Sequence, residues 1–319
     1  MPSKIIDNIL KKTGTPDLLE VLSDSLNSGE LQSLLLEVFS RKTAEIDPAK
    51  LLRNYKENRF VGPSEVLVSR ILAFDQMAYD AASGFQALEL APVAPLGSCA
   101  ALGTVHQNKV ISALRNTEVV SDSTNLLALE TALRRQNLLS ENAKSREAVR
   151  LCSSHRLVRG QYFEVPGFTA HFRVFALVSG GRDEGHFRFE VEELYRHFNF
   201  YLQMLAHANM LNLEIGKINV GITLLNDAIA KALIEEKVFQ PLRKEYSQVH
   251  FYFNDERQSG RGYYRYFCFN IDVQNPDSQL FNLGDGVCTD WTQKLLQNKK
   301  ERLLISGFGS ELFCKLFSL

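Results

Sequence analysis

Residues 149–178 read VRLCSSHRLVRGQYFEVPGFTAHFRVFALV, and this stretch decides the fold. Apolar and polar residues alternate in the two end segments, VRLCSSHRLVR and AHFRVFALV. The polar segment between them carries Gly160, Pro166 and Gly167, which favour turns. Alternation with a period of two is typical of β-strands, so the stretch predicts an antiparallel hairpin.

The polar chemistry of this hairpin sits where its strands meet the loop. Arg159 and Gln161 are two residues apart at the end of the first strand, so we expect their side chains on one face. The second strand opens with His171 and Phe172. A guanidinium, an amide and an aromatic ring can together hold a phosphate and stack on a base. A hairpin with an exposed arginine and a core phenylalanine is the alternative interpretation.

This pattern resembles motif 2 of the class II aminoacyl-tRNA synthetases, in which Arg-x-Glu closes one strand and a Phe opens the next. The resemblance implies that Arg159 is the catalytic arginine that holds the α-phosphate of ATP, and that Phe172 stacks on adenine. Gln161 stands where the family has its glutamate. The implied nucleotide site therefore keeps an acceptor there but loses a charge.

Residues 64–97 precede the hairpin and predict a long helix over 64–83, a turn at Gly84 and an extended strand within 85–97. The order of helix, turn and proline-containing strand resembles motif 1 of the same synthetase class. In that family the element forms the dimer interface, so the resemblance implies a homodimer. A helix followed by a proline-ended strand also occurs in unrelated proteins.

A second polar cluster, the sequence SDST, lies between these two elements at residues 121–124. It follows a short β-branched strand and precedes an apolar-striped helix, so Asp122 or Ser123 can cap that helix. In histidyl-type synthetases a corresponding turn carries an acidic residue and a Thr that face the amino group of the substrate. The resemblance implies the same amino-acid-binding role for Asp122 and Thr124.

Residues 249–274 alternate on both sides of a polar segment, DERQSGRG, and predict a second hairpin. Aromatic side chains on both predicted strands are expected to face one another and fix the register. These side chains are Phe251, Phe253, Tyr264, Tyr266 and Phe267.

The entry to the second of these strands, GYY, resembles the R-G-L-D-Y-Y element of histidyl-type synthetases and of the regulatory subunit of ATP phosphoribosyltransferase. The resemblance implies that Tyr263 and Tyr264 bind the amino acid. The family's Arg falls on Ser259 in this sequence. Arg257 and Arg261 flank that position and are the candidates for its role.

The segment 303–319 predicts a buried strand, a glycine turn and a helix, which resembles motif 3, G-x-G-x-E-R. Gly307, Gly309 and Glu311 match, and the resemblance implies a nucleotide-binding role for Glu311. Leu312 stands where the family has the Arg that clamps the γ-phosphate of ATP. A leucine cannot make that bidentate contact.

Residues 1–60 predict helices only, and we expect a helical N-terminal arm followed by a synthetase-like core over 61–319. Apolar residues recur at helical spacing in the arm and are expected to pack on the core. These are Leu31, Leu34, Leu35, Val38 and Phe39. The fold class expected for the core is α+β, a mostly antiparallel sheet flanked by helices.

The composition and charge of the chain argue against several classes of binding partner. A formal net charge of −1 over 319 residues argues against bulk electrostatic binding of nucleic acid. No membrane span or signal peptide is evident, and the five cysteines are single and odd in number, so a reducing cytoplasm and no membrane partner are expected. Cys152 and His155 have C-x-x-H spacing without a second ligand pair, so no structural metal is expected.

Two functions follow as expectations. The first is a stand-alone synthetase-like paralogue without an anticodon-binding domain, which binds an amino acid or an adenylate-type ligand and regulates a partner enzyme. The second is an ATP-dependent ligase that uses Mg²⁺, forms an aminoacyl-adenylate and passes the acyl group to tRNA or a carrier protein. An interaction protein with a decayed pocket is the third reading.

Overall fold

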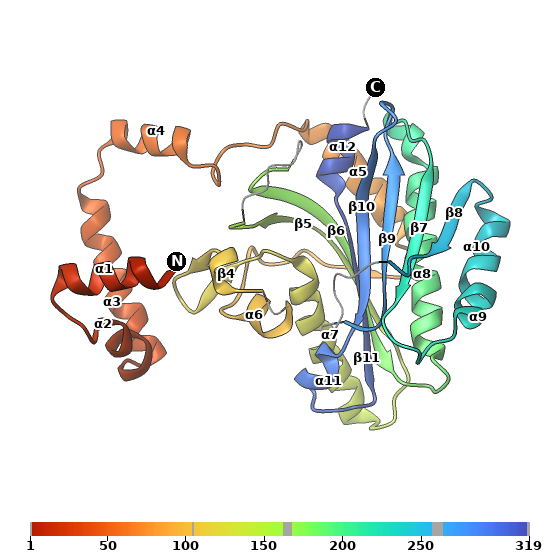
Figure 1. Ribbon diagram of the computed structural model, residues 1–319, viewed down its shortest axis with the longest axis horizontal. Helices are drawn as coiled ribbons and strands as arrows, with labels where there is room; N and C mark the ends of the chain where they lie inside the picture. Colours follow the sequence, from red (N-terminus) through yellow and green to blue (C-terminus); the bar gives the residue numbers. More distant parts are fainter. Residues whose placement is uncertain (1, 104, 162–167, 257–263, 318–319) are drawn as a thin grey trace.

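The computed structural model describes residues 2–103, 105–161, 168–256 and 264–317 (Figure 1). Its centre is an eight-stranded sheet with the order β1-β5-β6-β11-β10-β9-β7-β8. Neighbouring strands are antiparallel except in the outer pairs β1–β5 and β7–β8. The strands are β1 (Gln86–Ala87), β5 (Val149–Val158), β6 (His171–Arg182), β7 (Ile218–Leu224), β8 (Val249–Phe253), β9 (Arg265–Gln274), β10 (Leu280–Thr289) and β11 (Glu301–Phe308). The predicted α+β class with a mostly antiparallel sheet is confirmed.

The predicted hairpin at the centre of the sequence is confirmed as β5 and β6. Its last strand pairs join Val158 to His171 and Leu157 to Phe172. Strand β5 ends one residue before Arg159, but the Arg159 amide still donates to the Ala170 carbonyl at 2.9 Å. Arg159 therefore leaves the sheet on a backbone that the ladder still holds in place.

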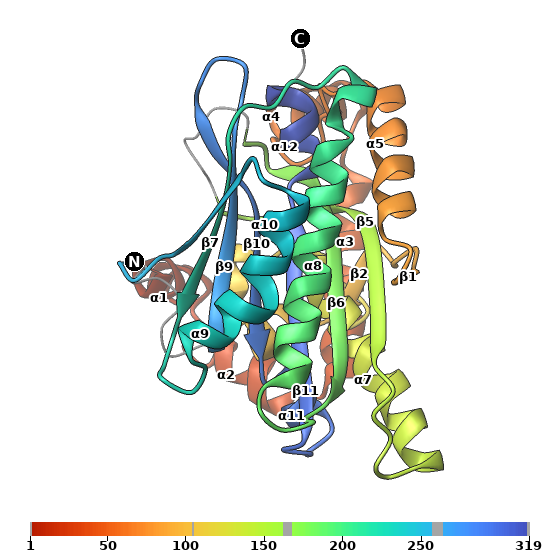
Figure 2. The same cartoon turned by 90° about the vertical axis from the view of Figure 1, so that its right-hand side faces the viewer.

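Helices cover both faces of the sheet (Figure 2). On one face α5 (Val68–Ala81), α8 (Arg188–Ala206) and α12 (Ser310–Leu316) pack on a large aromatic core that includes Phe74, Phe198 and Phe308. On the other face α7 (Ser123–Glu141) and α11 (Trp291–Leu295) cover a smaller apolar cluster. Beside α8 lie α9 (Lys231–Ile234), the π-helix η4 (Glu235–Phe239) and α10 (Gln240–Glu245).

The smaller elements lie beside the hairpin. A three-stranded sheet has the order β2-β4-β3, formed by β2 (Val93–Pro95), β3 (Ser112–Ala113) and β4 (Thr117–Val119). Short helical turns complete the core: α6 (Ser98–Gly103), η2 (Gln107–Lys109) and η3 (Ala208–Leu211). The strand β4 leads directly into α7, as the sequence predicts.

The motif 1-like region differs from the prediction. Helix α5 begins at Val68, so residues 64–67 are not helical. The expected strand over 85–97 is two short strands in different sheets, β1 and β2. Prolines within this stretch interrupt the hydrogen-bonding ladder, which explains why it does not form one long strand.

The second predicted hairpin is wrong in its pairing. Strands β8 and β9 both form, but β7 lies between them, parallel to β8 and antiparallel to β9. The aromatic side chains of the two strands are therefore not direct cross-strand neighbours. Local alternation predicts that a segment is a strand, whereas its neighbour depends on the order of the whole sheet.

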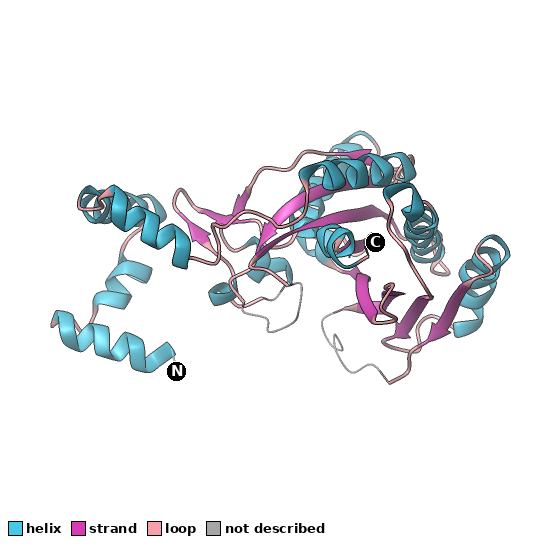
Figure 3. Cartoon of the chain, turned by 90° about the horizontal axis from the view of Figure 1, so that it is seen from above, coloured by secondary structure: helices cyan, strands magenta, loops and turns pink. Residues whose placement is uncertain are grey.

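The N-terminal residues form the predicted helices: α1 (Pro2–Thr13), α2 (Leu18–Glu20), the π-helix η1 (Val21–Ser25), α3 (Ser28–Ala44) and α4 (Pro48–Glu57). Asn27 and Glu30 form a capping box at α3, and Asp47 caps α4. The expectation that the apolar face of α3 packs on the core is wrong, because Leu34 and Phe39 are 43% and 50% exposed. These helices extend away from the core in Figure 3. Amphipathic spacing shows that a face is apolar but not what covers it.

Among the described residues, no helix is long and apolar enough to span a membrane. All five cysteines are buried and carry free thiols. Burial raises the pKa of the Cys152 and Cys314 thiols to about 12, so these two groups are unreactive packing residues.

Candidate functional site

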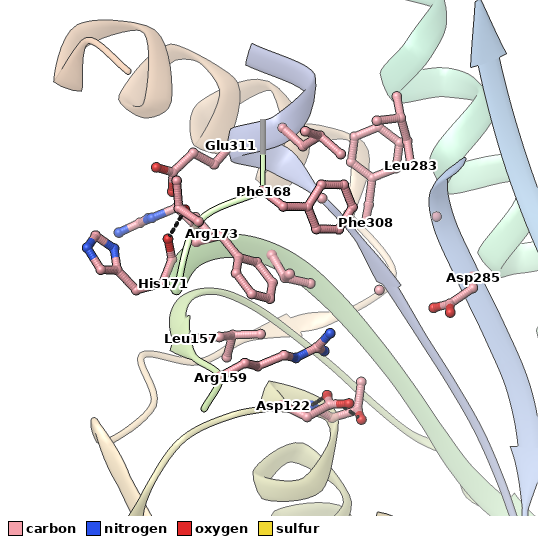
Figure 4. A pocket seen from close by; sticks show the side chains of 18 of the residues that line it. Asp122, Leu157, Arg159, Phe168, His171, Arg173, Leu283, Asp285, Phe308 and Glu311 are labelled. Carbon is pink, nitrogen blue, oxygen red and sulfur yellow. Dashed lines mark hydrogen bonds between the residues drawn. The ribbon is translucent and has the colours of Figure 1, made fainter. Parts of the chain in front are cut away.

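A polar-lined cavity of about 510 Å³ lies at the end of the β5–β6 hairpin (Figure 4). Its walls come from the hairpin, from β10 and β11, from the first turn of α7 and from α12. The segment 59–66, which links the N-terminal helices to the core, also lines it. Of the predicted site residues, Asp122, Thr124, Arg159, Phe172, Tyr264 and Glu311 line this cavity.

Asp122 is the N-cap of α7. Of the two capping residues that the sequence allowed, the structure therefore uses Asp122 and not Ser123. Its Oδ1 accepts hydrogen bonds from the Thr124 amide at 2.9 Å and from the Thr124 hydroxyl at 2.8 Å. Both of these hydrogen bonds use Oδ1, and Oδ2 of Asp122 has no hydrogen-bond partner among the residues that the structure describes. Asp122 and Thr124 thus lie together at the cavity wall, as the resemblance implies.

Asn125 is a site residue that the sequence analysis missed. It lines the cavity, is only 3% exposed, and its Oδ1 has no hydrogen-bond partner. A buried acceptor without a donor is costly, so such a group in a cavity indicates a ligand donor. The sequence signal was an amide within the first turn of α7, where an N-terminal capping role explains polar residues equally well.

Arg159 is held next to Asp122 by a hydrogen bond to the backbone of the preceding residue. Its Nε donates to the carbonyl oxygen of Ser121 at 3.1 Å. Its guanidinium carbon lies 5.0 Å from the centre of the Phe172 ring, a cation–π distance. The arrangement brings together the predicted phosphate arginine, the predicted stacking ring and the residue next to Asp122. Figure 4 shows Arg159 directly above Asp122 at the cavity wall.

The other four predicted site residues do not belong to the described lining of the cavity. Gln161 is exposed and does not belong to the cavity lining, although its carbonyl accepts from Arg59 at 3.5 Å. Arg257, Arg261 and Tyr263 lie outside the described residues. Their predicted roles therefore remain predictions.

Glu311 lies at the opposite end of the cavity and is already engaged. Its Oε1 accepts a hydrogen bond from the Ser64 hydroxyl, and its Oε2 forms an ion pair with Nη2 of Arg156 at 2.8 Å. Leu312 lines the cavity beside it. The motif 3-like helix therefore presents a neutralised carboxylate and an apolar side chain to the cavity.

The segment 59–66, which we call the linker strap, crosses the cavity between the hairpin and α12. Nη2 of Arg59 donates to the Gly160 carbonyl at 2.6 Å, and Glu65 pairs with Lys315 at 2.5 Å. The His171 ring takes a hydrogen bond from Arg156 at Nδ1 and donates from Nε2 to the Gly62 carbonyl, at 2.9 and 2.6 Å. The linker strap could not be predicted from the sequence, because its contacts join residues about a hundred or more positions apart.

Asp285 is a second lining residue that the sequence analysis missed. It lies on β10, and in Figure 4 it faces the cavity from the side opposite Arg159. With Glu65, Asp122 and Glu311 it makes four carboxylates among the described residues that line the cavity.

Glu193 and His197, one turn apart on α8, have structural partners. Glu193 accepts from Arg150 at 2.7 Å, and the His197 ring nitrogens contact Ser179 at 3.0 Å and Ser306 at 2.8 Å. Burial, helped by the positive charge of Arg150, lowers the pKa of His197 to about 3. Among the described residues, no group of three or more His, Cys, Asp or Glu side chains could hold a metal ion.

Comparison with solved structures identifies the fold. An ATP phosphoribosyltransferase regulatory subunit/histidyl-tRNA synthetase from Bacillus halodurans aligns with a TM-score of 0.56 and 11% identity, covering 80% of this chain and 82% of that one. The chain has the class II aminoacyl-tRNA synthetase fold. Histidyl-tRNA synthetase from S. aureus aligns with a TM-score of 0.53 and 12% identity, covering 78% of this chain and 66% of that one.

A histidine–tRNA ligase subunit from Alicyclobacillus acidocaldarius aligns with a TM-score of 0.56 and 10% identity, covering 79% of this chain and 94% of that one. No protein-family model matches the sequence, and a comparison with curated proteins also finds no match. The synthetase-like fold inferred from the motif order is therefore confirmed by structure rather than by sequence identity.

Proposed function

We propose that this chain is a stand-alone class II synthetase-like protein that binds an amino acid or an adenylate-type ligand and acts as a regulatory subunit. The observation that carries the proposal is the pairing of Asp122 and Arg159 in one cavity. They are linked through the Ser121 carbonyl, and they form no ion pair with each other. A carboxylate and a guanidinium that are held apart in one cavity suit a ligand that carries both a positive and a negative group.

The two ends of that ligand follow from the side chains. The free carboxylate oxygen of Asp122 can accept a hydrogen bond from an ammonium group, and Thr124 fixes the carboxylate in position. The guanidinium of Arg159 can hold a carboxylate or a phosphate through its two Nη groups. Phe172 and Tyr264 supply aromatic surface in the same cavity.

ATP with Mg²⁺ is the co-substrate that the fold family implies, and the described residues fit it poorly. Leu312 replaces the γ-phosphate arginine, and the Glu311 carboxylate is occupied by Ser64 and Arg156. We therefore derive no adenylation step. The alternative function, an ATP-dependent ligase that charges tRNA or a carrier protein, is favoured by Phe172 lining the same cavity as Arg159. It would require Arg257 or Arg261 to replace the missing arginine.

The proposal includes a homodimer formed through residues 64–97. Large apolar side chains at the start of α5 support this surface, since Leu67, Val68 and Leu72 are 67%, 72% and 62% exposed. A regulatory role also requires a partner enzyme. The buried free thiols suit a reducing compartment such as the cytoplasm.

Equilibrium dialysis with each of the twenty labelled amino acids tests the proposal. We expect saturable binding of one or a few of them, lost in Asp122→Ala and in Arg159→Ala. The exposed residues Asp227 and Arg146, replaced by Ala, are matched controls away from the cavity. Unchanged affinity in Asp122→Ala would remove the assignment of the ammonium site.

A further inference from the structure

We infer that the N-terminal arm, residues 2–57, is an interaction surface whose partner is the N-terminal arm of a second copy of this chain. The surface lies outside the cavity and is distinct from the α5 surface of the proposed homodimer. The inference therefore does not depend on which ligand the cavity binds.

The burial of the arm carries the first step. No residue between positions 4 and 57 is buried by the described part of the chain, although most of these residues are helical. The arm reaches the turn between β3 and β4 at the start of α3. There the Ser28 hydroxyl donates to Oδ1 of Asn116 at 2.6 Å, and Oε1 of Gln32 accepts from the Arg115 amide. Figure 1 shows the rest of the arm lying beside the core. Helices in proteins are stabilised mainly by packing of an apolar face, so these helices require a partner.

The apolar side chains of the arm carry the second step. On α4, Leu51, Leu52 and Tyr55 have the i, i+1 and i+4 spacing of one helix face and are 60%, 56% and 49% exposed. The other two long helices also leave apolar side chains exposed. These are Ile5 and Ile9 on α1, and Leu34, Leu36, Val38 and Phe39 on α3. Exposed apolar side chains gathered on one segment indicate a protein–protein contact.

The charges of the arm carry the third step, because they are divided into blocks. Residues 14–40 carry five carboxylates and no lysine or arginine. The flanking segments 2–13 and 41–57 together carry eight lysines and arginines against four carboxylates. Among the described residues of the arm, the one ion pair between these blocks joins Arg41 to Glu37, one turn apart on α3. The acidic centre of one arm therefore complements the basic ends of another.

The same charge pattern selects a second copy over other partners. Nucleic acids and anionic membranes attract a continuous basic surface, whereas the carboxylates of residues 14–40 would repel their phosphate groups. A second copy carries the complementary blocks and the same apolar side chains. In a two-fold arrangement each favourable contact is made twice.

Sedimentation-velocity ultracentrifugation of full-chain variants tests the inference. Leu72→Asp adds a charge to the exposed α5 surface, and we expect this variant to remain a dimer of twice the chain mass of 36.1 kDa. Adding Phe39→Asp places a charge among the apolar side chains of α3 and should raise the dissociation constant about tenfold or more. Ser40→Asp adds the same charge at an exposed polar position of α3 and is the control. Circular dichroism checks that each variant is folded.

A pair of charge variants tests the inference without changing the apolar side chains, which also covers the case that Phe39→Asp unfolds α3. One full-chain variant carries Asp24→Lys and Glu37→Lys in the acidic block, and the other carries Lys50→Glu and Arg53→Glu in a basic block. We expect each to self-associate more weakly than the natural chain. Their mixture should form heterodimers more tightly than either variant forms homodimers, because both kinds of contact are then attractive.

Three outcomes would overturn the inference. A monomeric Leu72→Asp chain at about 100 µM would assign self-association to the α5 surface and leave the arm to a different protein. Equal dissociation constants after Phe39→Asp and Ser40→Asp, with a mixture of the charge variants no tighter than its components, would place the contact elsewhere. Association of the natural chain with phosphatidylserine vesicles or with RNA, lost in the Lys50→Glu and Arg53→Glu variant, would identify the wrong partner. None of these results changes the test of amino-acid binding, so the proposed function and this inference fail separately.

Discussion

The hydroxyl of Ser64 donates a hydrogen bond to Oε1 of Glu311 and joins the linker strap to the first turn of α12. The Arg156 ion pair at 2.8 Å holds the other oxygen of the same carboxylate. Glu311 thus connects three parts of the chain: the linker strap, β5 and α12. The carboxylate to which the motif resemblance assigns a nucleotide-binding role therefore already has two partners in the chain.

Ser64→Ala should loosen the linker strap. The lost hydrogen bond to a charged acceptor corresponds to about 1–2 kcal/mol of local stability, so amide exchange within residues 60–66 should accelerate about tenfold. Hydrogen–deuterium exchange with mass spectrometry measures this directly. Ser83→Ala, at an exposed serine, is the control. Equal exchange rates in the two variants would show that the Glu311 contact does not hold the linker strap.

Arg135 and Glu301 form a buried ion pair, and removing one partner should strongly lower the free energy of unfolding. Both side chains are 0% exposed and are joined by two hydrogen bonds of 2.8 and 3.1 Å. Arg135→Met leaves a buried carboxylate without its partner and should lower the free energy of unfolding by about 3–5 kcal/mol, measured by urea denaturation. Arg134→Met, which breaks the partly exposed pair with Glu130, should cost less than about 1 kcal/mol. Similar losses in both variants would contradict this difference.

Gly286 is required by close packing within the sheet. A Cβ atom there would overlap the Phe269 ring and approach the Ser306 Cβ within 2.7 Å. We expect Gly286→Ala to lower the free energy of unfolding by about 1–3 kcal/mol. Gly284→Ala, where the nearest atoms lie at 3.4 Å, should be milder. Thermal unfolding of the two variants measures both losses. A greater loss in Gly284→Ala than in Gly286→Ala would contradict the packing argument.

His197 makes stability depend on pH. Its folded-state pKa of about 3 lies below the unfolded value near 6.5, because burial first and Arg150 second disfavour the charged ring. Above pH 6.5 both states are neutral and the contribution is complete. As the pH falls from 6.5 towards 3, only the unfolded state gains the proton, and stability is lost at about 1.4 kcal/mol per pH unit.

The variant His197→Gln isolates this contribution. Between pH 6 and pH 5 the natural protein should lose about 1 kcal/mol more unfolding free energy than the variant. Asp75 and Glu190, whose pKa values are raised by burial, act in the opposite direction but are common to both proteins. Parallel urea-denaturation curves at the two pH values would show that the His197 ring is protonated in the folded state.

The sequence predicted the elements that have local signals. Alternation predicted β5 and β6, the SDST turn predicted the start of α7 with Asp122 or Ser123 as its cap, and the G-x-G-x-E segment predicted α12. These patterns arise from neighbouring residues, so no knowledge of distant contacts was needed. The order of three such motifs was enough to indicate the synthetase-like fold.

Features that depend on distant contacts could not be predicted. The insertion of β7 between β8 and β9 is a property of the whole sheet. The contact between Ser64 and Glu311 joins residues 247 positions apart. Asn125 could not be distinguished from an ordinary capping residue, because its burial and its missing donor exist only in the folded chain.

Thermal unfolding in the presence of each of the twenty amino acids, without ATP, tests the central claim most directly. A ligand that binds only the folded chain adds about 2.7 kcal/mol at a hundred times its dissociation constant, so the melting temperature must rise. The account predicts such a rise with at least one amino acid and its loss in Arg159→Ala. No rise with any of them, from protein that unfolds cooperatively, would contradict it.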